Sequence, residues 1–130
     1  METILIVEDE ETLREAGAKV LERQGFSVIQ ANDGSAALDA IRTTPRRIDL
    51  MLLDVTLPGA SSEEVFAAAN QLRPKMAIIL TSAYAEESIV ASFGAAVRNR
   101  FIRKPYQLRD LADMIGKTLR TKVSMSRPIA

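Results

Sequence analysis

The sequence predicts an α/β fold in which five parallel strands form one doubly wound sheet, a (βα)5 unit with helices on both faces. Short apolar runs that are typical of strands alternate along the whole chain with stretches whose apolar residues recur at helical spacing. Alternation of this kind favours a parallel sheet covered by crossover helices. Several of the apolar runs also end in charged or hydroxyl residues, and ligands bind beyond the C-terminal ends of parallel strands.

Five short apolar runs are expected to be the strands. They lie at residues 4–7, 26–29, 48–53, 76–80 and 101–102. The first run ends in the acidic stretch Glu8–Glu11, and the third ends in a lone carboxylate, Asp54. The fifth is brief, because only two apolar residues mark it.

Five helices are expected between and after these runs, with apolar residues at helical spacing over residues 13–21, 37–41, 65–72, 85–93 and 108–119. The first helix should stop at Gly25, and the second should start at Asp33. Ser61 and Ser62 are both plausible N-caps of the third helix, which Pro74 follows. The fourth helix is short and weakly marked.

The composition indicates one globular domain without a strong overall charge. The chain has 130 residues, enough for one domain with a sizeable core, and its 17 basic residues balance 17 acidic ones. It contains no cysteine and no histidine, which excludes disulfides, thiolate chemistry and a phosphohistidine on this chain. We expect residues 1–121 to form the domain and residues 122–130 to be a polar, frayed tail. The apolar runs are too short for a membrane span and no signal-peptide pattern is found, so a cytoplasmic location is expected.

Three carboxylates follow two of the predicted strands and suit a divalent cation. Glu8 and Asp9 come after the first strand, and Asp54 comes after the third. Carboxylate oxygens, with waters completing an octahedron, are the ligands that Mg²⁺ prefers. Without a cation the three groups would repel one another if they lay close together. The sequence therefore predicts a magnesium site.

The remaining strand ends supply groups that suit a phosphoryl group. Lys104 offers a compact positive charge, Ser82 offers a hydroxyl donor, and Ala83 is small enough to let an anion approach its backbone N–H. Phosphoryl transfer depends mostly on positioning and charge neutralisation, which this set provides. With the Asp54 carboxylate as nucleophile, the product is an aspartyl phosphate.

Four short motifs give the chain a family resemblance. They are Val7–Glu10, Leu53–Gly59, Leu80–Tyr84 and Arg103–Tyr106, each at the end of a predicted strand. Any one of them is a weak signal, but the four in this order are specific. The whole chain resembles a response-regulator receiver domain of two-component signalling, which implies a flavodoxin-like fold for residues 1–121. The resemblance also suggests a cis peptide bond before Pro105.

The resemblance implies roles for the acidic residues. Asp54 is then the phosphoacceptor, phosphorylated from the phosphohistidine of a histidine kinase. Asp9 binds Mg²⁺ directly, Glu8 binds it largely through water, and Thr56 binds it through its backbone carbonyl. Glu8 stands where many relatives have Asp, a tolerated departure.

The resemblance also implies a conformational switch. Ser82 is then the switching hydroxyl, and Phe101 is the aromatic switch residue. Phe101 has no hydroxyl where many relatives have Tyr, so its movement must act through packing alone. Thr81 is a rival for the hydroxyl role, but the family pattern of a hydroxyl followed by a small residue fits Ser82 and Ala83 better.

Three other functions would use some of the same residues or the same architecture. A phosphatase of the haloacid-dehalogenase type also uses a strand-end Asp and Mg²⁺, but it places a second Asp where this chain has Thr56. A flavodoxin-like FMN binder needs a hydroxyl- and glycine-rich loop where this chain has Glu8–Glu11. A receiver-like interaction module that is not phosphorylated stays open, although the complete acidic set argues against it.

The expected partners follow from the resemblance. They are a histidine kinase or a histidine phosphotransfer domain, and the stretches 57–64 and 81–87 are similar to receivers appended to hybrid sensor histidine kinases. The resemblance also allows a homodimer through the fourth helix, fifth strand and fifth helix. The basic cluster over residues 98–104 indicates a solvated edge or a protein contact, because no recognition helix accompanies it for nucleic acid.

Overall fold

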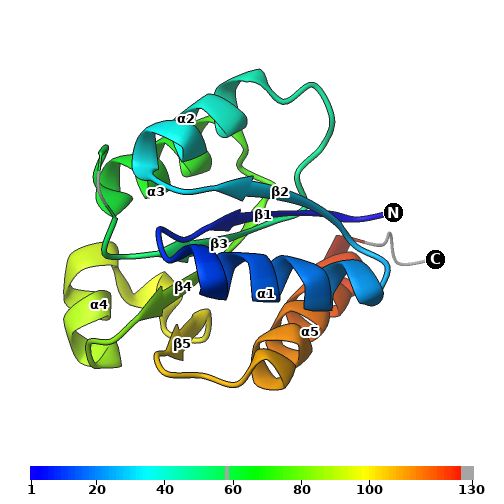
Figure 1. Cartoon of the computed structure of the whole chain (residues 1–130). Helices are drawn as coiled ribbons and strands as arrows, with labels where there is room; N and C mark the ends of the chain where they lie inside the picture. Colours follow the sequence, from blue (N-terminus) through cyan, green and yellow to red (C-terminus); the bar gives the residue numbers. More distant parts are fainter. Residues whose placement is uncertain (58, 127–130) are drawn as a thin grey trace.

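The computed structural model of the protein describes residues 1–57 and 59–126 (Figure 1). The strands are β1 (Thr3–Val7), β2 (Ser27–Ala31), β3 (Leu50–Asp54), β4 (Ala77–Ser82) and β5 (Phe101–Arg103). The helices are α1 (Glu11–Arg23), α2 (Gly34–Thr43), α3 (Ser62–Leu72), α4 (Glu86–Phe93) and α5 (Leu108–Ser126), with a short 3-10 helix, η1 (Ala95–Val97). The predicted (βα)5 fold is confirmed for the described part of the chain.

The sheet is parallel throughout and has the order β2-β1-β3-β4-β5. The chain moves from β1 to β2 on one side, and then from β3 to β5 on the other. The strand order therefore reverses between β1 and β3, and a crevice at such a reversal is where doubly wound sheets bind ligands. Val7 pairs with Leu53 in the register, so Glu8 and Asp54 follow neighbouring strands at this point.

Helices cover both faces of the sheet, with α1 and α5 on one face and α2, α3 and α4 on the other (Figure 1). Side chains alternate along β3, so Leu52 packs on the α1/α5 side and Leu53 packs on the α2–α4 side. Every residue of β3 is buried. Burial on both faces explains why the run reads as continuously apolar and not as alternating.

Polar groups fix the helix ends near the sheet. Asp33 caps α2, where its Oδ1 accepts a hydrogen bond from the backbone N–H of Ala36 at 2.7 Å. Of the two candidate caps of α3, Ser61 is the N-cap, and its Oγ accepts from the N–H of Glu64 at 3.1 Å. Such caps satisfy backbone donors that the helix itself leaves unpaired.

The C-terminal ends of α2 and α3 are joined by one guanidinium group. Arg73 follows α3, and its side chain donates to the backbone carbonyls of Ile41 at 2.8 Å, Thr44 at 2.7 Å and Arg46 at 3.2 Å. Carbonyls at a helix C-terminus have no partner within the helix. Arg73 therefore holds α2 and α3 together at one end.

The observed boundaries differ from the expected ones for local reasons. β2 begins after Phe26, because the N–H of Phe26 donates back to the carbonyl of Leu21 and belongs to the turn that ends α1. β4 extends to Ser82, which pairs with Arg103 of β5. The 3-10 helix η1 was not expected.

The C-terminal part of the chain continues the last helix. The backbone of α5 is helical to Ser126, and residues 127–130 lie outside the described residues. The expectation of a frayed tail at 122–130 stays a prediction. No helix in the described part of the chain has the length and the apolar character needed to cross a membrane.

Candidate functional site

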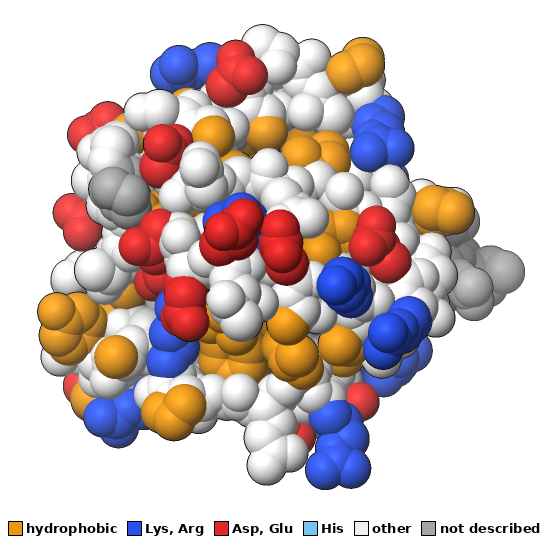
Figure 2. Space-filling model, in the orientation of Figure 1, with side chains coloured by type: hydrophobic (Ala, Val, Ile, Leu, Met, Phe, Trp, Pro, Cys, Tyr) orange, Lys and Arg blue, Asp and Glu red, His pale blue; other side chains and the backbone are white. Residues whose placement is uncertain are grey.

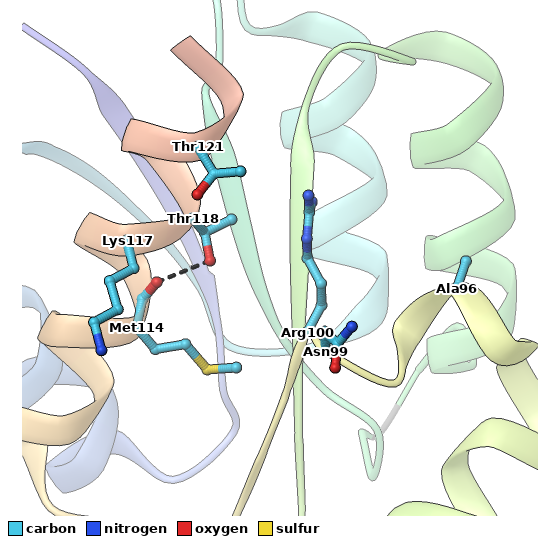
Figure 3. A pocket seen from close by; sticks show the side chains of 7 residues that line it. All are labelled: Ala96, Asn99, Arg100, Met114, Lys117, Thr118 and Thr121. Atoms are coloured by element: carbon cyan, nitrogen blue, oxygen red, sulfur yellow. Dashed lines mark hydrogen bonds between the residues drawn. The ribbon is translucent and has the colours of Figure 1, made fainter. Parts of the chain in front are cut away.

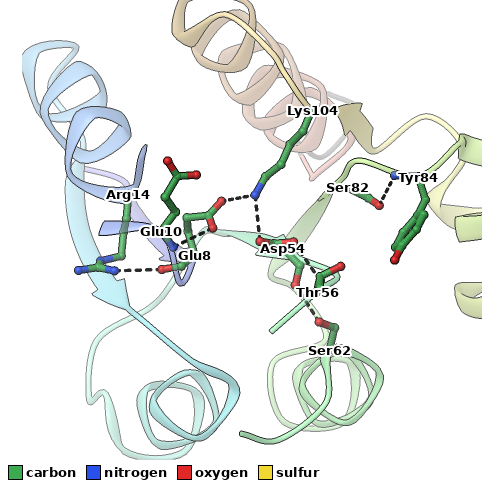
Figure 4. A network of polar contacts seen from close by, with 9 residues as sticks. All are labelled: Glu8, Glu10, Arg14, Asp54, Thr56, Ser62, Ser82, Tyr84 and Lys104. Atoms are coloured by element: carbon green, nitrogen blue, oxygen red, sulfur yellow. Dashed lines mark hydrogen bonds and ion pairs between the residues drawn. The ribbon is translucent and has the colours of Figure 1, made fainter. Parts of the chain in front are cut away.

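Three strand ends meet at the ammonium group of Lys104 (Figure 4). Its Nζ lies 2.6 Å from Oε1 of Glu8 and 2.9 Å from Oδ2 of Asp54. Both carboxylate side chains are 5% exposed, and the Lys104 side chain is 21% exposed. The predicted neighbours Glu8, Asp54 and Lys104 are therefore brought together, and the peptide bond between Lys104 and Pro105 is cis, as the motif suggested.

Asp54, the last residue of β3, is held at three atoms. Its Oδ2 accepts from Lys104, and its Oδ1 accepts from the N–H of Thr56 at 3.0 Å. Its backbone carbonyl accepts from the hydroxyl of Ser62 at 2.7 Å. The carboxylate therefore has a fixed orientation at the C-terminal end of the sheet, where a carboxylate, which only accepts hydrogen bonds, can act as a ligand or nucleophile.

The carboxylates of Glu8, Asp9 and Asp54 can hold one cation. One oxygen from each residue lies within 4.8 Å of the others. Asp9 is exposed, whereas Glu8 is buried and its Oε2 accepts from the N–H of Glu10 at 3.1 Å. An oxygen-only set with one solvent-facing member is suited to Mg²⁺, which keeps several of its waters. Acidic side chains are grouped on the visible face on the side toward which the strands point (Figure 2).

The charge balance of the site changes the pKa of its lysine. Partial burial lowers the pKa of Lys104, but the hydrogen bonds to Glu8 and Asp54 outweigh burial and raise this pKa from 10.5 to about 12. Three carboxylates against one ammonium leave negative charge in excess. The site is therefore suited to a further cation.

The two candidate hydroxyls lie at the end of β4. The Oγ of Ser82 accepts from the N–H of Tyr84 at 2.8 Å, so the side chain is directed toward Tyr84 and not toward Asp54 (Figure 4). Thr81 pairs in register with Asp54, and both residues are buried. Successive side chains of a strand point to opposite faces, so only one of Thr81 and Ser82 can face the site, and Thr81 stays the alternative.

The remaining predicted residues border the site. Ala83, after β4, and Thr56, after β3, are exposed, while Phe101 in β5 is half-buried and packs against the core on the α2–α4 side. Lys104 donates its backbone N–H to the carbonyl of Ser82 at 2.8 Å, which fixes its chain beside β4. The site thus places the switch candidates Ser82 and Phe101 on adjacent strands.

Three neighbours of the site were not predicted from the sequence. The sequence indicates Ser62 only as a helix cap, and no spacing rule links it to Asp54. Arg14 donates to the backbone carbonyl of Glu8 at 3.1 Å. Tyr106 is half-buried, and burial, followed by the negative charge of Glu8, raises its pKa to about 12. Its place two residues after Lys104 was the only available signal.

A separate groove of about 750 Å³ lies between α5 and the segment before β5 (Figure 3). Its lining includes Arg100, Met114 and Thr118. It is next to the N-terminal end of β5, whereas Asp54 lies at the C-terminal end of β3. The groove therefore lies at the N-terminal end of the parallel strands, and the acidic site lies at their C-terminal end.

The raised pKa predicts a pH-dependent stability. The pKa of Lys104 in the folded state exceeds 10.5. Its ion pairs therefore stabilise the folded state fully below pH 10.5, and this stabilisation is lost as pH rises through about 12. A pKa shift of this size corresponds to roughly 2 kcal/mol in the free energy of unfolding. With chelator present, Lys104→Met should lower the free energy of unfolding by about this amount at pH 8, and the difference should disappear near pH 12. Urea denaturation across this range measures it, and a constant difference would contradict the ion-pair account.

The comparisons with known proteins agree over most of the chain. The sequence model of the response regulator receiver domain matches residues 4–116. The chain is 36% identical over 121 residues to the cyclic di-GMP phosphodiesterase of Thermotoga maritima, a match that covers 93% of this chain and 32% of that protein. It is 28% identical over 117 residues to the sensor kinase CckA of Brucella abortus, covering 90% of this chain and 12% of that protein. The chain therefore spans only a small part of these two relatives.

Other relatives match over nearly their full length. Sporulation initiation phosphotransferase F of Bacillus subtilis is 29% identical over 121 residues, covering 93% of this chain and 96% of that protein.

Three solved structures have the same fold. A receiver domain protein from Methanospirillum hungatei has a TM-score of 0.84 at 29% identity, covering 97% of this chain and 99% of that chain. The response regulator TrrA from Thermotoga maritima, in complex with Mg²⁺ and BeF, has a TM-score of 0.75 at 26% identity, covering 90% of this chain and 98% of that chain. The receiver domain of the hybrid histidine kinase CckA has a TM-score of 0.73 at 27% identity, covering 90% of this chain and 98% of that chain. This chain belongs to the response regulator receiver domain family, whose members act in two-component phosphorelays with histidine kinases or phosphotransfer proteins.

Proposed function

We propose that this chain is a phosphorylation-dependent switch that accepts a phosphoryl group on Asp54 from a phosphohistidine, with Mg²⁺ bound at Glu8, Asp9 and Asp54. One observation carries the proposal. A nearly buried strand-end carboxylate is paired with the Lys104 ammonium and has the oxygens of Glu8 and Asp9 within 4.8 Å. This arrangement combines a nucleophile, a cation site and a fixed positive charge in one crevice.

The transfer exchanges one bond to phosphorus for another. An oxygen of the Asp54 carboxylate attacks the phosphorus of the donor phosphohistidine, and the P–N bond breaks as the O–P bond forms. The donor imidazole leaves and takes up a proton. Mg²⁺, when bound, neutralises charge on the phosphoryl oxygens. The backbone carbonyl of Thr56 completes the proposed ligand set.

Lys104 and the end of β4 receive the phosphoryl oxygens. The Nζ of Lys104 already lies 2.9 Å from Oδ2 of Asp54, so it can donate to a phosphoryl oxygen added there. Ser82 is an acceptor from Tyr84 in this structure, and its hydroxyl can still donate its own proton. The backbone N–H of Ala83, an exposed residue, is the third proposed contact.

Two observations on relatives support the proposal. TrrA, with the same fold at 26% identity, forms a complex with Mg²⁺ and BeF. The sensor kinase CckA and the receiver of the hybrid kinase CckA both align with this chain, which supports the receiver of a hybrid sensor histidine kinase as its setting. A homodimer through α4, β5 and α5, a cytoplasmic location and a lack of nucleic-acid binding are further parts of the proposal.

The acceptor assignment predicts a specific loss. Asp54→Asn removes the nucleophile and keeps the shape of the side chain, so the variant should stay folded and take up no phosphoryl group. Beryllofluoride, which mimics a phosphoryl group on a carboxylate, should bind the wild type and not this variant, as NMR spectra of both would record. Asp39→Asn, at an exposed position of α2, is the matched control and should behave as the wild type. Binding of beryllofluoride to Asp54→Asn would sink the assignment.

The metal site predicts unequal costs for two neighbouring acids. Asp9→Ala removes a direct ligand and should weaken Mg²⁺ binding by roughly 100-fold, whereas Glu8→Ala removes a water-mediated contact and should weaken it by roughly tenfold or less. Titration of Mg²⁺ followed by NMR measures both constants. Wild-type affinity in both variants would place the metal elsewhere.

The switch predicts that phosphorylation and its response can be separated. Ser82→Ala should leave Asp54 phosphorylatable but remove the chemical-shift changes that beryllofluoride produces near Phe101 in the wild type. The reason is that the added charge acts on β4 and β5 through this hydroxyl. Thr81→Val is the parallel variant. If Thr81→Val removes the changes and Ser82→Ala keeps them, then Thr81 is the switching residue.

A further inference from the structure

The loop between β3 and α3 presses its backbone against the first turn of α2. Gly34 is the first residue of α2 and is buried. A Cβ built on Gly34 would overlap the carbonyl oxygen of Ala60, and it would lie 2.7 Å from the carbonyl carbon and 3.1 Å from the Cα of Ala60. These are backbone atoms, so no change of side-chain rotamer can make room. Glycine is required here because of space and not because of its φ angle.

The contact is close from the other side as well. Gly59 has a φ of +81°, a conformation that favours glycine, and a Cβ on it would lie 3.1 Å from the Oγ of Ser35. The first turn of α2 is itself fixed, because Asp33 caps it at 2.7 Å. The loop therefore rests on a rigid support.

The same loop begins and ends at the proposed phosphoacceptor. Near its start, the N–H of Thr56 donates to the Asp54 carboxylate. At its end, the hydroxyl of Ser62 donates to the Asp54 carbonyl. Between these two points, Ala60 lies against Gly34 and Gly59 lies beside Ser35, both in the first turn of α2. Ala60 is four residues after Thr56 in the same loop.

We propose that Gly34 is a positioning residue for the phosphoacceptor loop. Because glycine has no side chain, the Ala60 backbone can pack directly against Gly34 in α2. This contact fixes the position of the Thr56 carbonyl relative to Asp54 and Asp9. The inference rests on the proposed Mg²⁺ site. It assigns to α2, which supplies none of the proposed ligands, an indirect part in the metal affinity.

The test compares two buried helical glycines. Gly34→Ala should push Ala60 away and weaken Mg²⁺ binding by roughly tenfold, the size expected for a group that supports a ligand. At saturating Mg²⁺ the rate of phosphorylation by acetyl phosphate should return toward that of the wild type, because Asp54 and Lys104 are unchanged. Gly17→Ala is the control, since a Cβ on Gly17 would lie 3.8 Å from Cδ1 of Ile6, an ordinary contact. Its Mg²⁺ affinity should equal that of the wild type.

A second measurement uses the wild type and does not depend on the variant folding. In an NMR titration with Mg²⁺, the amides of Gly34 and Ser35 should shift together with that of Thr56, at the same midpoint. If Thr56 shifts while Gly34 and Ser35 do not, or if folded Gly34→Ala binds Mg²⁺ as the wild type does, the positioning role is overturned. If neither Thr56 nor Asp54 responds to Mg²⁺, the proposed metal site itself fails, and the inference fails with it.

Discussion

The ammonium group of Lys104 holds two buried carboxylates, and the end of the sheet is organised around this contact. Glu8 and Asp54 follow the neighbouring strands β1 and β3, where the strand order brings them together. Burying one carboxylate without a partner costs several kcal/mol, and burying two side by side costs more. Lys104 follows β5, which β4 separates from β3, and its long side chain reaches both acids. Three loops therefore depend on one cation for their charge balance.

The same charge balance makes the site sensitive to a bound cation and to a phosphoryl group. The single ammonium does not neutralise Glu8, Asp9 and Asp54 together, so the crevice retains negative charge for a divalent ion. A phosphoryl group on Asp54 would bring further negative charge, and Lys104 then has a new acceptor beside its present one. The loops that support Asp54 are held by short contacts with Ser62 and α2. We infer that charge supplies the chemistry of this site and that packing supplies its precision.

The sequence predicts the fold and the main acidic residues because both depend on local pattern. Strand-like runs end in Glu8 and Asp54, and parallel pairing alone brings such ends to one edge. The partners of these residues depend on the path of loops, and the sequence has no periodic signal for it. Ser61 and Ser62 look equivalent in the sequence. In the structure, however, Ser61 caps α3, and Ser62 donates a hydrogen bond to the backbone carbonyl of Asp54. The role of Gly34 is steric and needs the position of Ala60, which only the three-dimensional structure gives.

The central claim is that Asp54 is the residue that becomes phosphorylated, and it can be tested at the level of the covalent bond. The protein is incubated with acetyl phosphate and Mg²⁺ and treated with borohydride, which reduces an acyl phosphate to an alcohol, and its peptides are then sequenced by tandem mass spectrometry. The account predicts that residue 54 alone is converted to homoserine, and that omission of Mg²⁺ prevents the conversion. Conversion at Glu8 or Asp9, or at no residue while phosphoryl uptake is observed, would contradict it.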